Sequence, residues 1–566
     1  MSHPFHYTNP YTSTRAPVFA RNVVATSHPL AAQAGLQILR QGGNAVDAAV
    51  ATAAAMTVCE PVSNGLGSDA FCIVWDGKKL HGLNASGCAP AAWTPAYFQG
   101  KYGDAPNPPK RGMDSVTVPG AISAWVALNK KLGKLPFTEV LQPAIDIATR
   151  GYLVPPVVQQ KWAAAVPELQ GQPGFAQAFM PHGRAPEVGE LFTFPAAATA
   201  LKKIANSRGV AFYGGEIAQA IEKFSVANGG AIKASDFERY KPEWVDPIGI
   251  DYRGYRLHEI GPNGQGIAAL MALGILDQFD LAAHKVDSVI SQHVQIEAMK
   301  LAFADVYRYV ADPASMQVSV HQLLDKAYLK SRARLIRMNK AQNFGPGNLA
   351  KGGTIYLTTA DESGMMVSFI QSNYMGFGSG CVEPTFGISL QNRGHAFDLA
   401  EGINQVAPNK RPFHTIIPAF LSQPKARSHP LAQVGSESVG RGEGGEAGLT
   451  SQDIDPVMSF GVMGANMQPQ GHVQTLVRML DYQQNPQAAC DAPRWRFNSG
   501  LGINVEAAMN PSTVQGLVER GHQVEVINDS YQDFGAGQFI WRAGDPGKEG
   551  YVAASDARRD GLAAGF

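Results

Sequence analysis

The sequence predicts an α+β fold, in which helices and antiparallel strands occupy different parts of the chain. Helical patterns dominate the first half, and short strands separated by turns dominate the last third. The strands do not alternate with helices, as they would in a parallel sheet built of βαβ units. We therefore expect helices that cover antiparallel sheets, and at 566 residues the chain can bury a large core.

Composition and charge exclude several classes of function. The chain has 47 Lys+Arg and 47 Asp+Glu residues, so it has no excess charge to attract nucleic acid or a membrane surface. Its most apolar stretch, residues 45–59, is too short to span a bilayer and contains Asp47. We expect no nucleic-acid partner and no membrane partner.

Cysteine usage and the first residues predict a cytoplasmic protein. The first 24 residues lack the apolar core of a secretory signal peptide. The cysteines are odd in number, are scattered and form no C-x-x-C pair, which favours reduced thiols over disulfides or a zinc site; they are Cys59, Cys72, Cys88, Cys381 and Cys490. Cys88 is interpreted as a small packing residue. No sequence motif calls for a cofactor or a metal.

The first 150 residues predict helices around a β-hairpin. Residues 27–43 form a helix with Ser27 at its start, and Asn44 begins a second helix that is apolar almost all round and therefore buried. A glycine-rich loop then leads into a hairpin that turns at Asp76-Gly77. Further on, the patterns predict a strand end at 115–120 that leads into a helix, and another helix at 135–151.

The middle of the chain is predicted to be mainly helical. Loops are expected at 181–195 and 243–251, and a hairpin at 251–260. Long helices are expected at 287–310 and 324–338. An exposed polar segment, residues 340–353, then precedes the central hairpin.

The last third alternates strands and turns. We expect strands at 415–421, 457–463, 504–506 and 523–527, a helix at 469–483, and two strands that flank the turn at 545–547. Residues 423–455 are rich in Gly, Ser and Glu and predict an exposed low-complexity loop.

The central hairpin, residues 351–380, places a threonine behind two glycines. Strand formers follow Thr354, turn residues occupy 361–364, and residues 365–371 predict a returning strand. If that turn closes the hairpin, Thr354 lies opposite Gln371 and Ser372 lies opposite Gly353. A second hydroxyl would then lie beside the Gly353–Thr354 peptide bond.

A threonine becomes a useful nucleophile when a base removes its proton, and an N-terminal threonine carries such a base in its own α-amine. That amine has an ordinary pKa of about 7.7–8.0, so part of it is neutral near physiological pH. Cleavage before Thr354 would create this N-terminus. On the Gly-Gly-Thr tripeptide alone, an ordinary strand start is the much better explanation.

Five motifs favour cleavage before Thr354 over an ordinary strand start. In this order and spacing they resemble the γ-glutamyltransferase family of N-terminal-nucleophile (Ntn) hydrolases. The motifs are SHPLAAQAGLQILRQGGNAVDAAVA, SVTVPGAISAW with LPFTEVLQPAIDIATRGY, the central hairpin, PNKRPFHTIIP and DAPRW. The resemblance implies a four-layer αββα sandwich, made as a precursor that cuts itself at Gly353–Thr354. Chains 1–353 and 354–566 would stay together as a heterodimer, and whether such heterodimers pair further is left open.

The resemblance also implies roles for four catalytic residues. Thr354 would attack an amide carbonyl, and Ser372 stands where the family has a second threonine that bonds the nucleophile. Gly464 and Ala465 stand where the family has a glycine pair that holds the oxyanion. Alanine keeps the N–H group but restricts φ, so the oxyanion site is expected to survive with an altered shape.

The positions that hold substrate in the family are changed here. Ser86 stands in place of the arginine that binds the α-carboxylate of a γ-glutamyl group, and serine lacks that bidentate fork. The other substitutions are Tyr374 for asparagine, Arg393 for glutamine, Ala396 for aspartate, and His414 and Thr415 for adjacent serines. Loss of the aspartate removes a partner for an α-ammonium group, so we expect an acyl group with less amino-acid character, and an anionic one is compatible with Arg393. The alternatives are a surface ion pair for Arg393 and a core aromatic for Tyr374.

The leading prediction is a self-processing amidohydrolase that cleaves a small-molecule amide through a Thr354 acyl-enzyme, with hydrolysis favoured over transfer. It would belong to a divergent branch that contains γ-glutamyltransferase-like proteins, oxamate amidohydrolases and cephalosporin acylases. The first alternative is a true γ-glutamyltransferase or glutathione hydrolase. The second is an unprocessed pseudoenzyme that serves as a scaffold.

Overall fold

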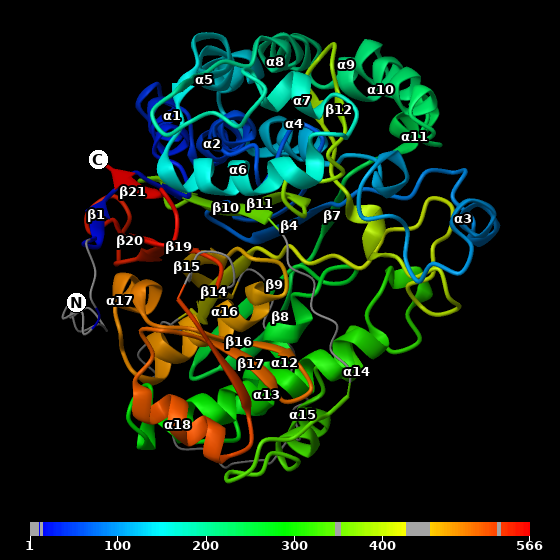
Figure 1. The fold of residues 1–566 in the computed structure, drawn as a ribbon. Helices are drawn as coiled ribbons and strands as arrows, with labels where there is room; N and C mark the ends of the chain where they lie inside the picture. The colour runs from blue at the N-terminus through cyan, green and yellow to red at the C-terminus, as the bar shows by residue number, and fades with distance from the viewer. Residues whose placement is uncertain (1–10, 12–14, 346–352, 426–452, 529–533) are drawn as a thin grey trace, which may run out of the picture.

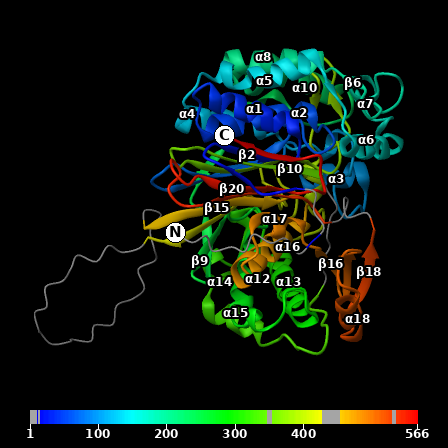
Figure 2. The same cartoon turned by 90° about the vertical axis from the view of Figure 1, so that its left-hand side faces the viewer.

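The computed structural model describes residues 11, 15–345, 353–425, 453–528 and 534–566, and these form four layers (Figure 1). Two sheets lie face to face, and helices cover the outer face of each, as the view in Figure 2 shows edge on. The predicted αββα sandwich is confirmed. Most of the expected low-complexity loop at 423–455, and part of the segment at 340–353, lie outside the described residues.

The upper sheet of Figure 1 has seven strands and contains the central hairpin. In spatial order its strands are β21 (Leu562–Gly565), β2 (Val23–Thr26), β10 (Gly353–Ala360), β11 (Met366–Tyr374), β3 (Asp69–Trp75), β4 (Leu80–Ala85) and β7 (Glu243–Val245). Neighbouring strands pair antiparallel throughout.

The lower sheet also has seven strands. In spatial order they are β1 (Val18–Ala20), β20 (Tyr551–Ser555), β19 (Gly537–Arg542), β15 (Ile454–Val462), β14 (Ala419–Pro424), β9 (Tyr255–Glu259) and β8 (Ile248–Tyr252). Both sheets mix strands from before and after residue 353, because β2 lies between β21 and β10, and β14 pairs with β9.

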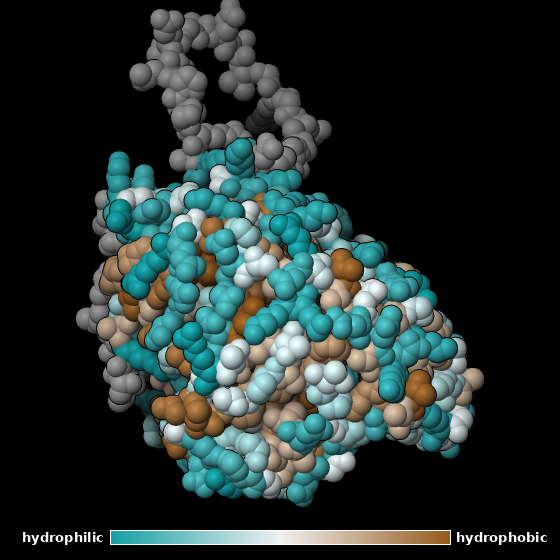
Figure 3. Space-filling model, turned by 90° about the horizontal axis from the view of Figure 1, so that it is seen from above, coloured by the Kyte–Doolittle hydropathy of each residue, from teal (hydrophilic) through white to brown (hydrophobic). Residues whose placement is uncertain are grey.

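Helices from the first half of the chain form the upper helical layer. They are α1 (Pro29–Arg40), α2 (Ala45–Cys59), α4 (Ala121–Leu132), α5 (Phe137–Arg150), α6 (Pro156–Leu169), α7 (Phe175–Phe179), α8 (Pro195–Ser207), α9 (Val210–Tyr213), α10 (Glu216–Ala227) and α11 (Ala234–Arg239), with α3 (Pro95–Tyr102) to one side. Seen from above, polar residues are interspersed with apolar ones over this face (Figure 3).

The lower helical layer combines helices from the middle and the end of the chain. They are α12 (Ile267–Leu276), α13 (Val289–Tyr309), α14 (Val320–Leu323), α15 (Lys326–Ala333), α16 (Met467–Leu476), α17 (Pro486–Asp491) and α18 (Pro511–Glu519). Three small sheets complete the fold: β5 (Tyr152–Leu153) with β6 (Leu191–Phe192), β12 (Val382–Glu383) with β13 (Ile388–Ser389), and β16 (Trp495–Ser499), β17 (Gly502–Glu506) and β18 (Gln523–Ile527).

Apolar side chains fill all three spaces between the layers. One core lies between the upper helices and their sheet, one between the two sheets, and one between the lower sheet and its helices. Every residue of α2 is buried, as its uniformly apolar sequence predicted, and Asn44 and Asp47 cap its start reciprocally. No described helix is long and apolar enough to cross a membrane.

Four local expectations were wrong. Residues 116–120 form no strand, and the expected loop at 243–251 instead contains β7 and β8, which pair with other strands across the fold. The strand expected from residue 415 begins only at Ala419, because Gln468 takes the N–H of Ile417. The first helix is capped by the His28 ring, since Ser27 is bonded to Glu60.

Candidate active site

Thr354 is the second residue of β10 and lies beside Ser372 of the neighbouring strand β11. The Thr354 Oγ1 donates to Ser372 Oγ over 3.2 Å. Ser372 Oγ also accepts from the N–H of Tyr374 over 2.8 Å. Thr354 is only 2% exposed and Ser372 is fully buried, so this pair of hydroxyls is held away from bulk water.

The hairpin register differs by one residue from the prediction. Ile355, rather than Thr354, lies opposite Gln371, and Gly353 lies opposite Tyr374. An irregularity between Gly353 and Ile355 absorbs the extra residue. Tyr374 takes a positive φ of 76° at this point. The two hydroxyls are in contact because Thr354 and Ser372 are the residues next to the Ile355–Gln371 pair in this register.

The turn at Gly464 and Ala465 follows β15 and presents two backbone donors. Their φ angles are 118° and 52°, and the second is strained because alanine rarely occupies the left-handed region. Among the described residues, neither N–H has a hydrogen-bond acceptor. Two adjacent unpaired N–H groups are the kind of donor that holds a developing oxyanion.

Gln265 and Asn466 hold this turn in its strained shape, and sequence reasoning missed both of them. Gln265 Nε2 donates to the carbonyl of Ala465 over 3.0 Å and to that of Thr415 over 2.6 Å. Asn466 Nδ2 donates to Gln265 Oε1 over 3.2 Å. The signal available in the sequence was only a Gly-Gln-Gly turn before an apolar helix.

Arg393 is fully buried and stacks on Tyr374, with its guanidinium carbon 4.2 Å from the ring centroid. Its Nη1 donates to Thr415 Oγ1 over 2.9 Å, whereas Nε and Nη2 have no hydrogen-bond partner among the described residues. Burial lowers the pKa of Arg393 to about 10, so it stays charged near neutral pH. A surface ion pair is excluded for this residue.

A pocket of about 310 Å³ opens next to this arginine. Tyr374, Ala396 and Thr415 line it, together with Asn466 from the strained turn. The Thr415 hydroxyl accepts from Arg393, so its own proton is free to point into the pocket. The pocket therefore has a donor hydroxyl on its wall with a buried positive charge behind it.

His414 does not line this pocket but is bonded to buried groups outside its wall. Its Nε2 lies 3.1 Å from Asp69 Oδ2, and its Nδ1 accepts from the N–H of Ile416. Burial and then the charge of Arg393 hold the pKa of His414 well below its usual value. The imidazole is therefore neutral and donates from Nε2 to Asp69.

Asp69 at the start of β3 is a further buried residue that sequence reasoning missed. It accepts from the N–H groups of Gly87 and Gly120 over 3.0 and 3.3 Å. Burial raises the pKa of Asp69 to about 7, against the opposing effect of Arg393. Its sequence signal was a lone carboxylate in the first position of a wholly apolar strand.

Ser86 is also buried away from the pocket lining. Its hydroxyl donates to Asn84 Oδ1 over 2.7 Å and lies 3.3 Å from Asn263 Oδ1. Cys88 is partly buried, and burial raises the pKa of its thiol to about 11. The thiol is therefore protonated at neutral pH, which agrees with a packing role and excludes a thiolate nucleophile there.

A second pocket of about 460 Å³ lies on the other side of Met375, which lines both pockets. Gly464 of the strained turn borders this second pocket, and basic side chains gather on its wall: Lys110, Arg111, Lys161 and Arg559. Arg111 is paired with Glu168 and with the carbonyl of Gly376. The strained turn thus contributes Asn466 to the first pocket and Gly464 to the second.

Neither pocket has a set of metal-ligating side chains. Within the described part of the chain, one group has the spacing of metal ligands, formed by His293, Glu297 and His522. It lines neither pocket. The chemistry around Thr354 is therefore built from hydroxyls, backbone N–H groups and a buried arginine, a set suited to attack on a carbonyl carbon.

Comparisons with known proteins agree with this geometry. A family model described as Gamma-glutamyltranspeptidase matches residues 31–440 and 447–566. The Glutathione hydrolase-like YwrD proenzyme of Bacillus subtilis is 34% identical over 558 residues, which cover 96% of this chain and 98% of that protein. The Oxamate amidohydrolase proenzyme of Klebsiella pneumoniae is 32% identical over 563 residues, which cover 97% and 99%.

A solved structure is similar over the same extent. The crystal structure of cephalosporin acylase from Bacillus halodurans is 46% identical, has a TM-score of 0.88, and covers 99% of this chain and 98% of its own. The family model and these relatives span almost the whole sequence, and the four layers match the expected sandwich. The chain therefore belongs to the gamma-glutamyltranspeptidase family and is an enzyme with the Ntn-hydrolase fold.

Proposed function

We propose that this enzyme cuts its own Gly353–Thr354 bond and then hydrolyses a small amide whose acyl group carries a carboxylate. The observation that supports the nucleophile best is the buried Thr354–Ser372 hydroxyl contact, and the two unpaired N–H groups of Gly464 and Ala465 supply donors for an oxyanion. The cut would release the α-amine of Thr354, which is the base that its hydroxyl needs.

The chemical steps use only groups of this chain and water. The Thr354 amine takes the proton of Oγ1 as the oxygen attacks the amide carbonyl, and the Gly464 and Ala465 N–H groups receive the oxyanion. The C–N bond then breaks, the amine leaves with the proton held by the ammonium group, and an ester remains on Thr354. Water hydrolyses that ester with the same amine as base. Ser372 would keep the Thr354 oxygen oriented toward the turn.

The acyl group would occupy the pocket lined by Tyr374, Ala396 and Thr415. The Thr415 hydroxyl, oriented by Arg393, would donate to a carboxylate, and the buried guanidinium would balance its charge. Ala396 offers no anion for an ammonium group, and the carboxylate that does line the pocket, Asp398, stands two residues away from that position. These three features favour the monoamide of a dicarboxylic acid over a γ-glutamyl amide.

The leaving amine would exit through the second pocket, whose wall is basic. We propose that hydrolysis prevails over transfer, because among the described residues the only acidic side chain that lines this pocket is Glu168, which is already paired with Lys110 and Arg111. An incoming amine is protonated near neutral pH and would meet positive charge there.

The two chains would remain one particle after the cut. Both sheets contain strands from 1–353 and from 354–566, and β2 is bonded on each side to a strand of the second chain. Separating the chains would break both sheets, so we propose a stable heterodimer.

A γ-glutamyl substrate is the alternative, because one relative is named glutathione hydrolase-like. The deciding experiment compares the purified, processed enzyme on glutaric and succinic monoanilides, an uncharged butyric anilide and γ-glutamyl anilide. We expect the monoanilides of the dicarboxylic acids to have the highest kcat/KM. A higher kcat/KM for γ-glutamyl anilide would refute the proposed acyl group but not Thr354 as nucleophile. Denaturing electrophoresis provides the independent test of processing, since a single 60.4 kDa band after long incubation would favour the pseudoenzyme.

A further inference from the structure

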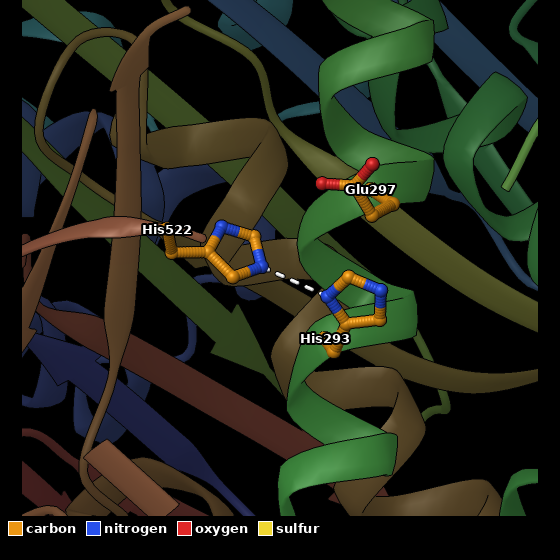
Figure 4. Close-up of side chains that lie close together, drawn as sticks. All are labelled: His293, Glu297 and His522. Carbon is orange, nitrogen blue, oxygen red and sulfur yellow. Dashed lines mark hydrogen bonds between the residues drawn. The ribbon is translucent and has the colours of Figure 1, made fainter. Parts of the chain in front are cut away.

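Four buried titratable side chains join the lower helical layer to the last part of the chain. Figure 4 shows three of them, His293, Glu297 and His522. His293, Glu297 and Lys300 follow one another at helical spacing on α13, and His522 comes shortly after α18. Their exposed fractions are 0%, 0%, 2% and 3%, respectively. In Figure 4 a nitrogen atom of each imidazole ring points toward the other ring, and Glu297 lies one turn along the same helix as His293.

The hydrogen bonds of this group fix the position of each proton. The Lys300 ammonium group donates to Glu297 Oε1 over 2.7 Å and lies 3.4 Å from His522 Nδ1. Because Nδ1 of His522 faces an ammonium group, it must be the acceptor, so the ring carries its proton on Nε2. That proton is donated to His293 Nδ1 over 2.8 Å. His293 then donates from Nε2 to the carbonyl of Arg337, also over 2.8 Å.

The same side chains hold the tail that follows α15, residues 337–345. Lys300 Nζ donates to the Gln342 carbonyl over 3.2 Å, and the Gln342 N–H donates to Glu297 Oε2 over 3.1 Å. Next to these bonds, the N–H of Ala341 donates to the carbonyl of Arg520 over 2.7 Å. The tail is therefore bonded both to α13 and to the segment that carries His522.

A metal ion is a weaker explanation for this group. The ligating atoms of His293, Glu297 and His522 lie within 4.8 Å of one another, as ligands would. However, the ammonium group of Lys300 already bonds two of these three residues and supplies the positive charge. A divalent cation would bring a second buried charge of the same sign next to it, at a high cost in solvation and repulsion.

We propose that His293, Glu297, Lys300 and His522 form a clasp that holds residues 337–342 against the second chain, and that added protons on its histidines open it. The clasp bridges the two chains that the proposed cut would produce, with three residues before Gly353 and one after it. It would anchor the tail close to the segment that leads to Gly353, and would keep the tail in place once the bond is cut.

Acid opens the clasp because its hydrogen-bond chain has no place for another proton. A proton on His293 Nδ1 would face the N–H of His522, and a proton on His522 Nδ1 would face the Lys300 ammonium group. Burial, with a contribution from the positive charges of Arg520 and Lys300, lowers the pKa of His293 to about 4. Burial and the same charges lower the pKa of His522 to about 2. Glu297 supplies the single negative charge, and it is bound to Lys300.

The direction of the pH effect follows from these lowered pKa values. An unfolded or released histidine binds a proton near pH 6.5, whereas the closed clasp excludes it. The stabilising contribution is therefore complete above pH 6.5 and falls as the pH drops toward 4. Each histidine can lower the equilibrium constant for closing the clasp by about tenfold per pH unit in that interval.

Hydrogen exchange of the tail tests the proposal without any measurement of activity. The full-length protein is exchanged at pH 7.5, 6.5, 5.5 and 5.0, and protection factors of the Ala341 and Gln342 amides are compared with those of amides in β17. We expect the tail amides to lose at least tenfold in protection between pH 7.5 and 5.0, while the β17 amides keep theirs. Constant protection of the tail over this range would refute the clasp.

Variants separate the clasp from general acid sensitivity. His293→Gln/His522→Gln removes the two titrating histidines and leaves Glu297, whose pKa is raised by burial, so most of the pH dependence of the tail protection should disappear in this variant. His258→Gln is the matched control, because His258 is a buried histidine with a pKa lowered to about 3 by burial, bonded to Ser422 in the lower sheet. That control should retain the acid response of the tail. If the acid response of the tail persists in the double variant and disappears in His258→Gln, the response originates at another site and the clasp is refuted. If the double variant does not fold, the wild-type pH series alone decides.

Discussion

The charge of Arg393 provides the sharpest test of the proposed acyl pocket. Replacing it with methionine keeps a long apolar side chain over Tyr374 but removes the cation behind the Thr415 hydroxyl. The residue has two buried guanidinium nitrogens without a hydrogen-bond partner among the described residues. Removing it therefore leaves few polar groups unsatisfied, and the protein should still fold.

The size of the effect follows from the geometry. Arg393 Nη1 lies 2.9 Å from Thr415 Oγ1, and a carboxylate bonded to that hydroxyl would add about 2.7 Å. Two opposite charges about 5–6 Å apart at an effective dielectric constant of about 20 attract each other by roughly 3 kcal/mol. Loss of that attraction corresponds to about a 100-fold fall in kcat/KM.

The assay compares two substrates that differ only in the distal charge, glutaric monoanilide and the anilide of the uncharged pentanoic acid. Arg393→Met should lower kcat/KM about 100-fold for the first and change it less than threefold for the second. Arg393→Lys keeps the cation and should lose less than tenfold on the charged substrate. Self-cleavage into two chains and the melting temperature serve as the folding control.

Equal losses on both substrates would refute the reasoning, because they would indicate a role in shaping the nucleophile rather than in binding an anion. So would a charged substrate that is hydrolysed equally well by the wild type and by Arg393→Met. A large fall in the melting temperature of Arg393→Met would contradict the inference that the fold does not depend on this guanidinium.

The remaining predictions concern the nucleophile and the strained turn. Thr354→Ala should leave a single full-length 60.4 kDa band, whereas two bands from this variant would contradict self-cleavage by that hydroxyl. Ser372→Ala should slow processing and turnover about 10- to 100-fold through loss of its bond to Thr354; Ser368→Ala, on the same strand but bonded to Tyr356, is the control and should change turnover little. Gly464→Ala should abolish activity while Ala465→Gly retains it, because an added Cβ at Gly464 would meet the Gly535 Cα at 3.0 Å at a φ of 118°; an active Gly464→Ala would remove this turn from the proposed oxyanion site.

Patterns that depend on neighbours in the chain could be predicted from the sequence. The apolar α2 with its capping box, the turns at Asp76-Gly77 and 545–547, and the hairpin that carries Thr354 all form as expected. Local propensity and turn chemistry are sufficient for such elements. The register of the hairpin was missed by one residue, since nothing in the sequence marks the irregularity after Gly353.

Elements stabilised by distant partners could not be predicted in this way. β7 is only three residues long, too short for its pattern to predict a strand, and it forms because β4 offers it an edge. Thr354 and Ser372 could be predicted as neighbours because one hairpin joins them. Asp69, Gln265 and Asn466 could not, because they approach the site from three separate elements, and only the assembled sheets bring them there.

Because both sheets mix strands from before and after residue 353, the enzyme is expected to fold efficiently only before the chain is cut. While the chain is continuous, β2 pairs with β10 and β21 of the same molecule. Once the chain is cut, recovery from denaturation would require two fragments to meet and to rebuild both sheets together, with their apolar faces exposed in the meantime. The mature enzyme would then persist through slow unfolding rather than through reversible equilibrium. Its thermal inactivation should consequently become irreversible at the moment of self-cleavage, whereas the uncut Thr354→Ala chain keeps a route back.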